Sequence, residues 1–316
     1  MRSVAAAVAA VLSAVLLAGC GSGPSQVGAA AIVGDTAIPI EYVQSWWDRY
    51  LSDRQRKEEV RAANSFDDLG RVIVTQAVRH ELLRTVAKRE GLQFDEAQVS
   101  QLIDDLGGEQ AAVDATNSIY DRNTIRDRAR DQLLAVALGR KYFETTSVRY
   151  DYTLADSRDE ALAKARELAA ADPDRTRSII EADRGNGIQV GIDQEQRIAD
   201  SVDYALNTPL FSVAAGNVVA FQDPDQANQG RWVVAVLHER KTDASPSSFA
   251  GAVTVDRVDD SRLEGIGLRL LGSMSTEVGV RVNPRYGLWS HVYVAVAQNE
   301  GEIPAIVVPM AQPTKG

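Results

Sequence analysis

Ala31-Ile32-Val33-Gly34-Asp35-Thr36-Ala37-Ile38-Pro39 sets the organisation of the first part of this chain. An apolar run leads into Gly34-Asp35, a pair typical of turns, and a second short extended piece follows. Residues 29–39 therefore predict a strand, a turn and another strand. The strand at Ile32 needs a further partner, and Val280 to Val282 is the one extended segment left without a partner in the predicted layout. We predict that these two segments pair, so that the chain returns to complete its first domain.

A helical region follows this strand pair. Apolar residues recur there at helical spacing, and helices are expected near residues 42–51, 65–91, 95–106 and 124–143. The second of them opens at Ser65 in the manner of a capping box, with aspartate in place of glutamate. It closes at Gly91, a residue suited to a left-handed cap. Residues 29–147 are therefore expected to form a strand followed by a helical module.

The pattern changes at residue 148. Residues 148–154 alternate at period two, which indicates a strand. The elements expected after it are two helices, an extended piece, a short helix and two strands, near residues 157–171, 173–182, 187–192, 200–206, 217–221 and 231–238. Residues 242–290 form the third piece. It begins with a boundary segment around Pro246 and is expected to contain one amphipathic helix and the strand at 280–282. Gly265-Ile266-Gly267 in that helix lacks the third glycine of a dinucleotide-binding loop, and we expect it to allow close helix packing.

Together these segments resemble the SurA/PrsA group of extracytoplasmic foldases. Residues 31–39 are similar to the group's opening strand and turn, residues 80–92 to its chaperone module, and Asn283-Pro284-Arg285-Tyr286-Gly287 to the C-terminal closure of actinobacterial members. The resemblance covers most of residues 29–290. It implies an α+β fold in three pieces: a mostly helical SurA-like chaperone module (29–147), an inserted parvulin-like βααβαββ domain (148–241), and a C-terminal helix and strand that complete the module (242–290). The alternative is two independent domains with no return of the chain. Residues 291–316 are expected to be a tail, poorly ordered from Glu302 to Gly316.

The inserted segment resembles a parvulin, the small isomerase domain of these proteins. Residues 209–218 are similar to its passage from helix to strand, and residues 230–236 to its last strand. Active parvulins carry one histidine in the first strand and another in the last, facing each other beneath the substrate proline. Here the first strand has Tyr150-Asp151-Tyr152, the last begins with Arg231-Trp232, and His238 lies further along, at the expected end of that strand. The resemblance, with these departures, implies a degenerate parvulin fold with no catalytic residues.

Four aromatic residues could still line a groove that binds peptides. They are Tyr150, Tyr152, Phe211 and Trp232. Aromatic rings stack on proline rings and bury a large area at low entropic cost, and binding pockets are commonly apolar concavities. The alternative is that the same four rings form the core of a small sheet.

The N-terminus carries an export signal. Met1-Arg2 supplies a positive start, an apolar run extends from Val4 to Leu17, and Leu17-Ala18-Gly19-Cys20 resembles the bacterial lipobox. The resemblance implies a signal peptide at 1–19, diacylglyceryl lipid on Cys20, and a flexible tether over 20–28. Two acyl chains give firmer membrane binding than one. We therefore expect a lipid-anchored protein on the extracytoplasmic face of the cell membrane; the alternative is an ordinary secretory signal with an accidental cysteine.

Composition excludes several kinds of site. The chain has 316 residues, a formal net charge of −10 and one cysteine, so nonspecific nucleic-acid binding is disfavoured and an intramolecular disulfide is impossible. His80-Glu81 begins like a zinc-protease motif, but Arg84 stands where the second histidine belongs. With His238 and His291 isolated, no metal site is expected. No cofactor motif is present, and no cofactor is expected.

Three functions remain for an exported chain of this kind. The first is a chaperone-like lipoprotein that binds unfolded or newly exported polypeptides between its helical module and its parvulin-like domain. The second is an active peptidyl-prolyl isomerase in which Asp151, Thr153 or tyrosine hydroxyls replace the histidines. The third is a non-enzymatic scaffold lipoprotein of envelope assembly with one dedicated partner. The sequence leaves the client and the oligomeric state open.

Overall fold

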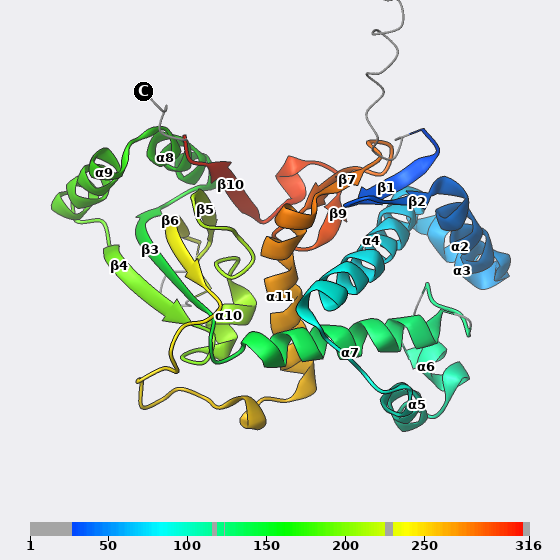
Figure 1. The fold of residues 1–316 in the computed structure, drawn as a ribbon. Helices are drawn as coiled ribbons and strands as arrows, with labels where there is room; N and C mark the ends of the chain where they lie inside the picture. The colour runs from blue at the N-terminus through cyan, green and yellow to red at the C-terminus, as the bar shows by residue number, and fades with distance from the viewer. Residues whose placement is uncertain (1–26, 116–118, 123, 225–229, 312–316) are drawn as a thin grey trace, which may run out of the picture.

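The computed structural model describes residues 27–115, 119–122, 124–224 and 230–311. The signal peptide, Cys20 and most of the expected tether lie outside the described residues. Figure 1 shows a sheet with helices α8 and α9 at the left, a small sheet with α2 and α3 at the right, and α11 between them. Within the described ranges, no helix has the length and apolar character needed to cross a membrane.

The small sheet closes the first domain. Its strands are β1 (Ala29–Val33), β2 (Thr36–Pro39) and β7 (Val280–Val282), in the order β2-β1-β7. The pairing of β1 with β7 is antiparallel and sets Ile32 opposite Arg281. The predicted return of the chain to its first strand is therefore confirmed. Gly34 makes the β1–β2 turn with a φ of 56°, a left-handed conformation that glycine adopts without steric cost.

Seven helices of the described chain surround or extend from this sheet. They are α2 (Ile40–Ser52), α3 (Arg54–Ala63), α4 (Phe66–Glu90), α5 (Glu96–Asp105), α6 (Glu109–Ala115), α7 (Ile125–Tyr142) and α11 (Asp260–Val278). The helices α7 and α11 cross at glycines: a Cβ on Gly139 would lie 2.1 Å from the Leu263 carbonyl oxygen, and one on Gly267 would lie 1.9 Å from that of Ala135. The close packing expected at Gly267 is confirmed. This contact joins the C-terminal helix to the N-terminal module.

The second sheet carries the inserted domain. Its strands are β3 (Ser147–Ala155), β4 (Val190–Arg197), β5 (Asn217–Gln222), β6 (Trp232–Lys241) and β10 (Ala305–Pro309), in the order β10-β5-β6-β3-β4. The helices α8 (Arg158–Ala170) and α9 (Pro173–Gly185) cover one face, and the short α10 (Val202–Asn207) precedes β5. The chain order from β3 to β6 is the predicted βααβαββ. The α+β fold class is thus confirmed.

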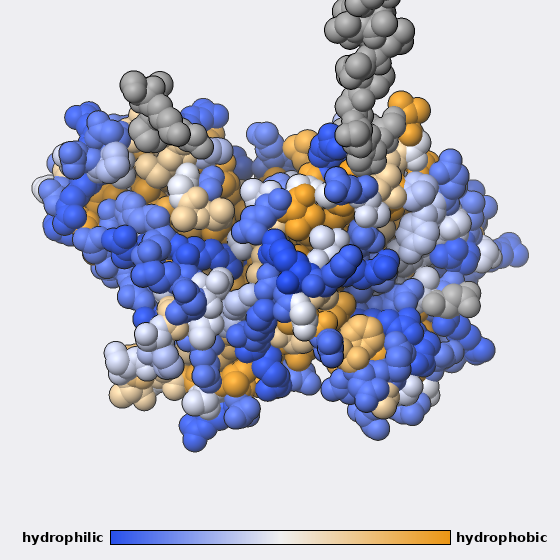
Figure 2. Space-filling view, viewed as in Figure 1, coloured by the Kyte–Doolittle hydropathy of each residue, from blue (hydrophilic) through white to orange (hydrophobic). Residues whose placement is uncertain are grey.

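The C-terminal segment corrects one expectation. Residues 305–309 form the edge strand β10 and pair with β5, whereas this part of the tail was expected to be poorly ordered. Ile306 and Val308 alternate toward α8, so the strand buries apolar side chains that a tail would leave in water. Before it, β8 (Leu288–Ser290) and β9 (Ala295–Ala297) form a hairpin against α4, and two short 3-10 turns lie at Val255–Arg257 (η2) and Glu300–Glu302 (η3). In Figure 2, polar residues cover most of the face shown, and apolar residues gather in the upper middle, beside β7 and β9.

Candidate functional site

A hollow of about 480 Å³ opens on the second sheet beside β3, β4 and α10. We call it the tyrosine hollow because Tyr150, Tyr152 and Tyr204 line it. Tyr150 and Tyr152 are two residues apart on β3, and since side chains alternate along a strand they share one face. Their ring centroids lie 6.1 Å apart, within the range of favourable aromatic pairs. Tyr204 comes from α10 and hydrogen-bonds to Tyr150.

A glycine on the neighbouring strand makes room for the half-buried ring of Tyr152. A Cβ on Gly191 would lie 2.3 Å from Cε1 of Tyr152, closer than any real contact. The Gln189 amide donates to the Tyr152 hydroxyl at 3.3 Å. Gln194, Asp203 and Asp223 also line the hollow, so polar and charged side chains accompany the aromatic rings.

The hydroxyls of Tyr150 and Tyr204 stay protonated at neutral pH. Burial raises the pKa of Tyr150 and of Tyr204, and the neighbouring hydroxyl adds to the effect at Tyr204. A neutral phenol donates and accepts hydrogen bonds but is a poor proton acceptor in acid–base catalysis. These two hydroxyls are therefore suited to hydrogen bonding with a bound chain and not to removing a proton.

The other two predicted groove residues lie elsewhere. Phe211 has an exposed fraction of 0% and belongs to the main core. Trp232 is 6% exposed and packs with the side chains of α8 on the opposite face of the sheet. Neither lines the hollow, so Phe211 and Trp232 do not share a groove with Tyr150 and Tyr152. Tyr204 is the aromatic partner that sequence reasoning missed; its position in the expected helical turn at 200–206 was the available signal.

Asp151 and His238 form a polar pair on the face away from the hollow. The Nε2 of His238 lies 3.0 Å from Oδ2 of Asp151, and the Asp193 backbone N–H donates to Oδ1 at 2.6 Å. Burial opposes the charge of Asp151, but these hydrogen bonds outweigh it and lower its pKa. His238 lies inside β6, three residues before its end at Lys241, and not at the strand's end as expected. The pair joins β3, β4 and β6.

Thr153 points to the same covered face. Its hydroxyl donates to Oδ2 of Asp183 at 2.6 Å, and Lys164 donates to the same oxygen at 2.9 Å. Thr153 has an exposed fraction of 0%. Of the groups that could replace the parvulin histidines, the tyrosine hydroxyls alone face the hollow. Among the described residues, no cluster of histidine, cysteine, aspartate or glutamate could hold a metal ion.

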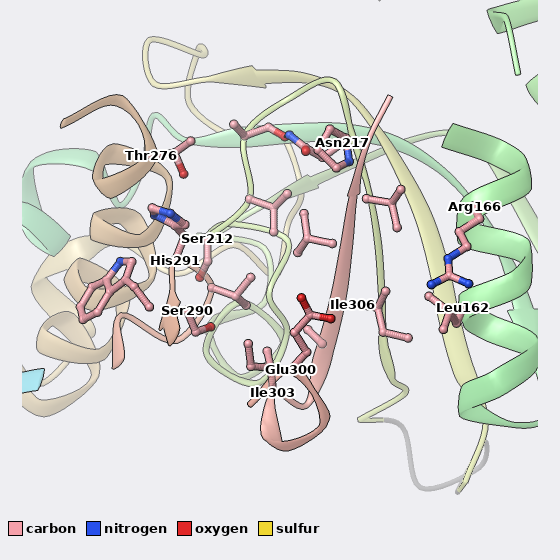
Figure 3. Close-up of a pocket in the computed structure, with 18 of the residues that line it drawn as sticks. Leu162, Arg166, Ser212, Asn217, Thr276, Ser290, His291, Glu300, Ile303 and Ile306 are labelled. Atoms are coloured by element: carbon pink, nitrogen blue, oxygen red, sulfur yellow. The ribbon is translucent and has the colours of Figure 1, made fainter. Parts of the chain in front are cut away.

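A second and larger cavity, of about 660 Å³, lies between the two parts of the molecule. We call it the β10 cleft, because it follows β10 between α8 on one side and Ser290–Val292 with the end of α11 on the other (Figure 3). His291 lines it and donates from Nδ1 to Ser275 Oγ at 2.8 Å, since the single proton of that hydroxyl is already given to the Gly272 carbonyl. Burial lowers the pKa of His291, which keeps its ring neutral.

No family model and no curated protein matches this chain. The chain is similar to a solved foldase. That structure is the foldase protein PrsA from Lactococcus lactis, which has 10% sequence identity to this chain and a TM-score of 0.31. The match covers 84% of this chain and 97% of the PrsA chain.

Proposed function

We propose that this chain is a membrane-anchored, extracytoplasmic chaperone-like protein that binds unfolded or newly exported polypeptides. The observation that carries the proposal is the tyrosine hollow, which offers rings from β3 and α10 to an entering chain. Such rings stack on proline and other apolar side chains without demanding a particular sequence. The amides of Gln189 and Gln194 at the rim can bond to peptide groups of the bound chain.

We infer that isomerase activity is lost. In support, Asp151 and Thr153 are committed to contacts on the covered face, and the buried tyrosines of the hollow stay neutral. A protease-coupled assay on a proline-containing tetrapeptide tests this. We expect no acceleration of cis–trans exchange. Acceleration that disappears in Tyr152→Phe would instead establish the isomerase alternative, with that hydroxyl as the active group.

Polypeptide binding is tested by light scattering during refolding of an aggregation-prone client. The full exported chain at equimolar amounts should slow aggregation, and Tyr152→Ala should weaken the effect because the accessible part of that ring is lost. Tyr42→Ala is the matched control, since Tyr42 is an exposed tyrosine on α2, far from the hollow in sequence and fold. An unchanged aggregation rate with the unaltered protein contradicts the proposal. Crosslinking in cells separates the scaffold alternative: one dominant adduct supports a scaffold, and many adducts support a chaperone.

Anchoring rests on Cys20. The first described residue, Val27, is 92% exposed, so the chain reaches the folded body at its surface, as a tether requires. A Cys20→Ala change should abolish labelling by a palmitate analogue and release the protein from the membrane fraction. Persistent labelling in that variant would place the lipid elsewhere and contradict the lipobox assignment.

A further inference from the structure

The outer edge of β10 presents unpaired backbone groups. β10 is the edge strand of its sheet and pairs with β5 alone among the described strands. The Met310 N–H donates to the Gly216 carbonyl, and bonding residues alternate along antiparallel strands, so Ile306 and Val308 bond inward. The N–H and C=O of Val307 therefore point outward. Val307 is 39% exposed and lines the β10 cleft, so this edge faces that cleft.

The β10 cleft runs along this open edge and has the form of a slot. Leu162 from α8 and Ile306 from β10 lie on one side of it, and Ser290 and His291 lie on the other (Figure 3). Near η3 the slot narrows, because Arg158 donates to the Glu300 carbonyl at 3.3 Å. A slot with walls on both faces and free backbone groups along its base fits an extended strand, which adds to a sheet edge through main-chain hydrogen bonds.

Two polar side-chain atoms in the cleft wall also have no partner within the described structure. They are the Oγ of Ser212 and the indole Nε1 of Trp289. Ser212 is 1% exposed, so its hydroxyl is buried without a hydrogen bond. Such groups cost free energy, and because both atoms lie behind the lining surface, a ligand could satisfy them only if the wall shifts as it enters.

The charges along α8 indicate what the strand carries. Arg158, Leu162 and Arg166 are four residues apart in turn, which places them on one helix face, and all three line the cleft. Arg166 has no ion pair or hydrogen bond in the described part of the chain. Glu300 is the one carboxylate among the described lining residues, so the two guanidinium groups outnumber it and favour a ligand with an apolar centre and acidic flanks.

We propose that the β10 cleft binds an extended polypeptide segment with an apolar, β-branched centre and acidic flanks, which joins the sheet beside β10. This is a second site, separate from the tyrosine hollow. A second copy of the chain fits less well. Pairing of two β10 edges across a two-fold axis would place both α8 helices on the same face of the joined sheet, with Arg158 and Arg166 of one copy near those of the other.

The decisive variant is Val307→Pro. It removes the outward N–H and fills the edge with a proline ring, while the inward bonds of Ile306 and Val308 to β5 remain. Val307→Thr is the matched control, since it keeps the N–H and a β-branched shape. The probe is a fluorescein-labelled hexapeptide of alternating valine and threonine, with aspartate at both ends, measured by anisotropy. We expect Val307→Pro to weaken binding at least about tenfold and Val307→Thr to change it little.

Reversing the charge of Arg166 provides a second test, which concerns the acidic flanks of the peptide. Arg166→Glu should weaken binding of the aspartate-flanked peptide and strengthen binding of the same peptide with lysine flanks. Equal affinity of both peptides for both proteins would overturn the proposal, as would an unchanged affinity in Val307→Pro. Sedimentation of the protein alone tests the second-copy occupant: a dimer abolished by Val307→Pro would assign the edge to self-association and overturn the peptide assignment.

The same measurements distinguish this site from the tyrosine hollow. Tyr152→Ala should leave binding of the hexapeptide unchanged, because the peptide carries no proline or aromatic residue and the hollow lies beside β4, at the other edge of the sheet. Loss of hexapeptide binding in Tyr152→Ala with no effect of Val307→Pro would place the peptide in the hollow. Suppression of client aggregation can fail while hexapeptide binding persists, so the two proposals stand or fall separately.

Discussion

The Nδ1 of His80 lies 2.8 Å from Oδ1 of Asp131, and this contact joins α4 to α7 in the helical module. The hydrogen bond raises the pKa of His80 above its ordinary value of 6.5, although burial of the ring opposes the charge. Burial raises the pKa of Asp131 as well. His80, which begins the incomplete zinc-protease motif of the sequence, thus links two helices through Asp131.

This link makes stability depend on pH. Because the folded pKa of His80 is raised, its contribution is fully present below the unfolded pKa and is lost as pH rises through the folded value. His80→Gln should therefore lower the free energy of unfolding by roughly 1–3 kcal/mol at pH 6 and by clearly less at pH 9. Urea unfolding at the two pH values measures this. An equal loss at both would show that His80 is neutral in the fold, and the double variant with Asp131→Asn isolates the pair.

Glu90 has the opposite pH dependence. Although desolvation opposes its charge, hydrogen bonds from Tyr142, Lys141 and Arg89 lower its pKa to about 2. Its contribution is present above the unfolded pKa and is lost as pH falls toward the folded value. Glu90→Gln should cost roughly 1–3 kcal/mol at pH 6 and little at pH 2.5, by chemical denaturation. Glu277→Gln is the control, because it removes the other carboxylate paired with Arg89. The side chain of Glu277 is 64% exposed, so the change should cost about 0–1 kcal/mol.

The crossing of α7 and α11 gives a packing prediction. In Gly267→Ala the new Cβ would lie 1.9 Å from the Ala135 backbone oxygen, so the helices must separate. We expect a loss of about 1–3 kcal/mol or more, measured as a lower thermal midpoint. Gly185→Ala is the control, because a Cβ there meets nothing within 4 Å at the end of α9 and should be neutral or slightly stabilising. Equal midpoints for the two variants would contradict the close crossing.

The sequence predicted those parts of the fold that rest on local pattern. The βααβαββ order follows from periodicity, and the β1–β7 pairing from one strand that lacked a partner. β10 was missed because Ala305–Val308 is short and lies between Pro304 and Pro309, a composition that also suits a tail. Its partner β5 lies more than 80 residues earlier in the chain, and no local pattern identifies such a long-range partner.

Of the four aromatic residues that the sequence suggested for a groove, Tyr150 and Tyr152 line the tyrosine hollow. Alternation places Tyr150 and Tyr152 on one face of β3, and that much is local. Trp232 pairs with Ala155, an odd-numbered position of β3 whose side chain faces α8, so it belongs to the opposite face. The sequence shows which side chains of a strand share a face, but it does not show which of the two faces a helix covers. The β10 cleft requires two distant segments and had no local signal.

The last prediction concerns the shape of the tyrosine hollow. In Gly191→Ala the added Cβ would lie 2.3 Å from the Tyr152 ring and 2.8 Å from Cγ of Gln194, so both side chains must move. Since the backbone of β4 need not break its pairing with β3, we expect a folded protein with a near-normal thermal midpoint. Binding of a proline-rich peptide should weaken, while binding of the aspartate-flanked hexapeptide at β10 should not. Gly187→Ala cannot serve as control because its φ of 82° strains alanine, whereas Gly185→Ala can. Unchanged proline-rich binding in Gly191→Ala would mean that the position of the Tyr152 ring does not matter, which would remove the main support for the hollow as a binding site.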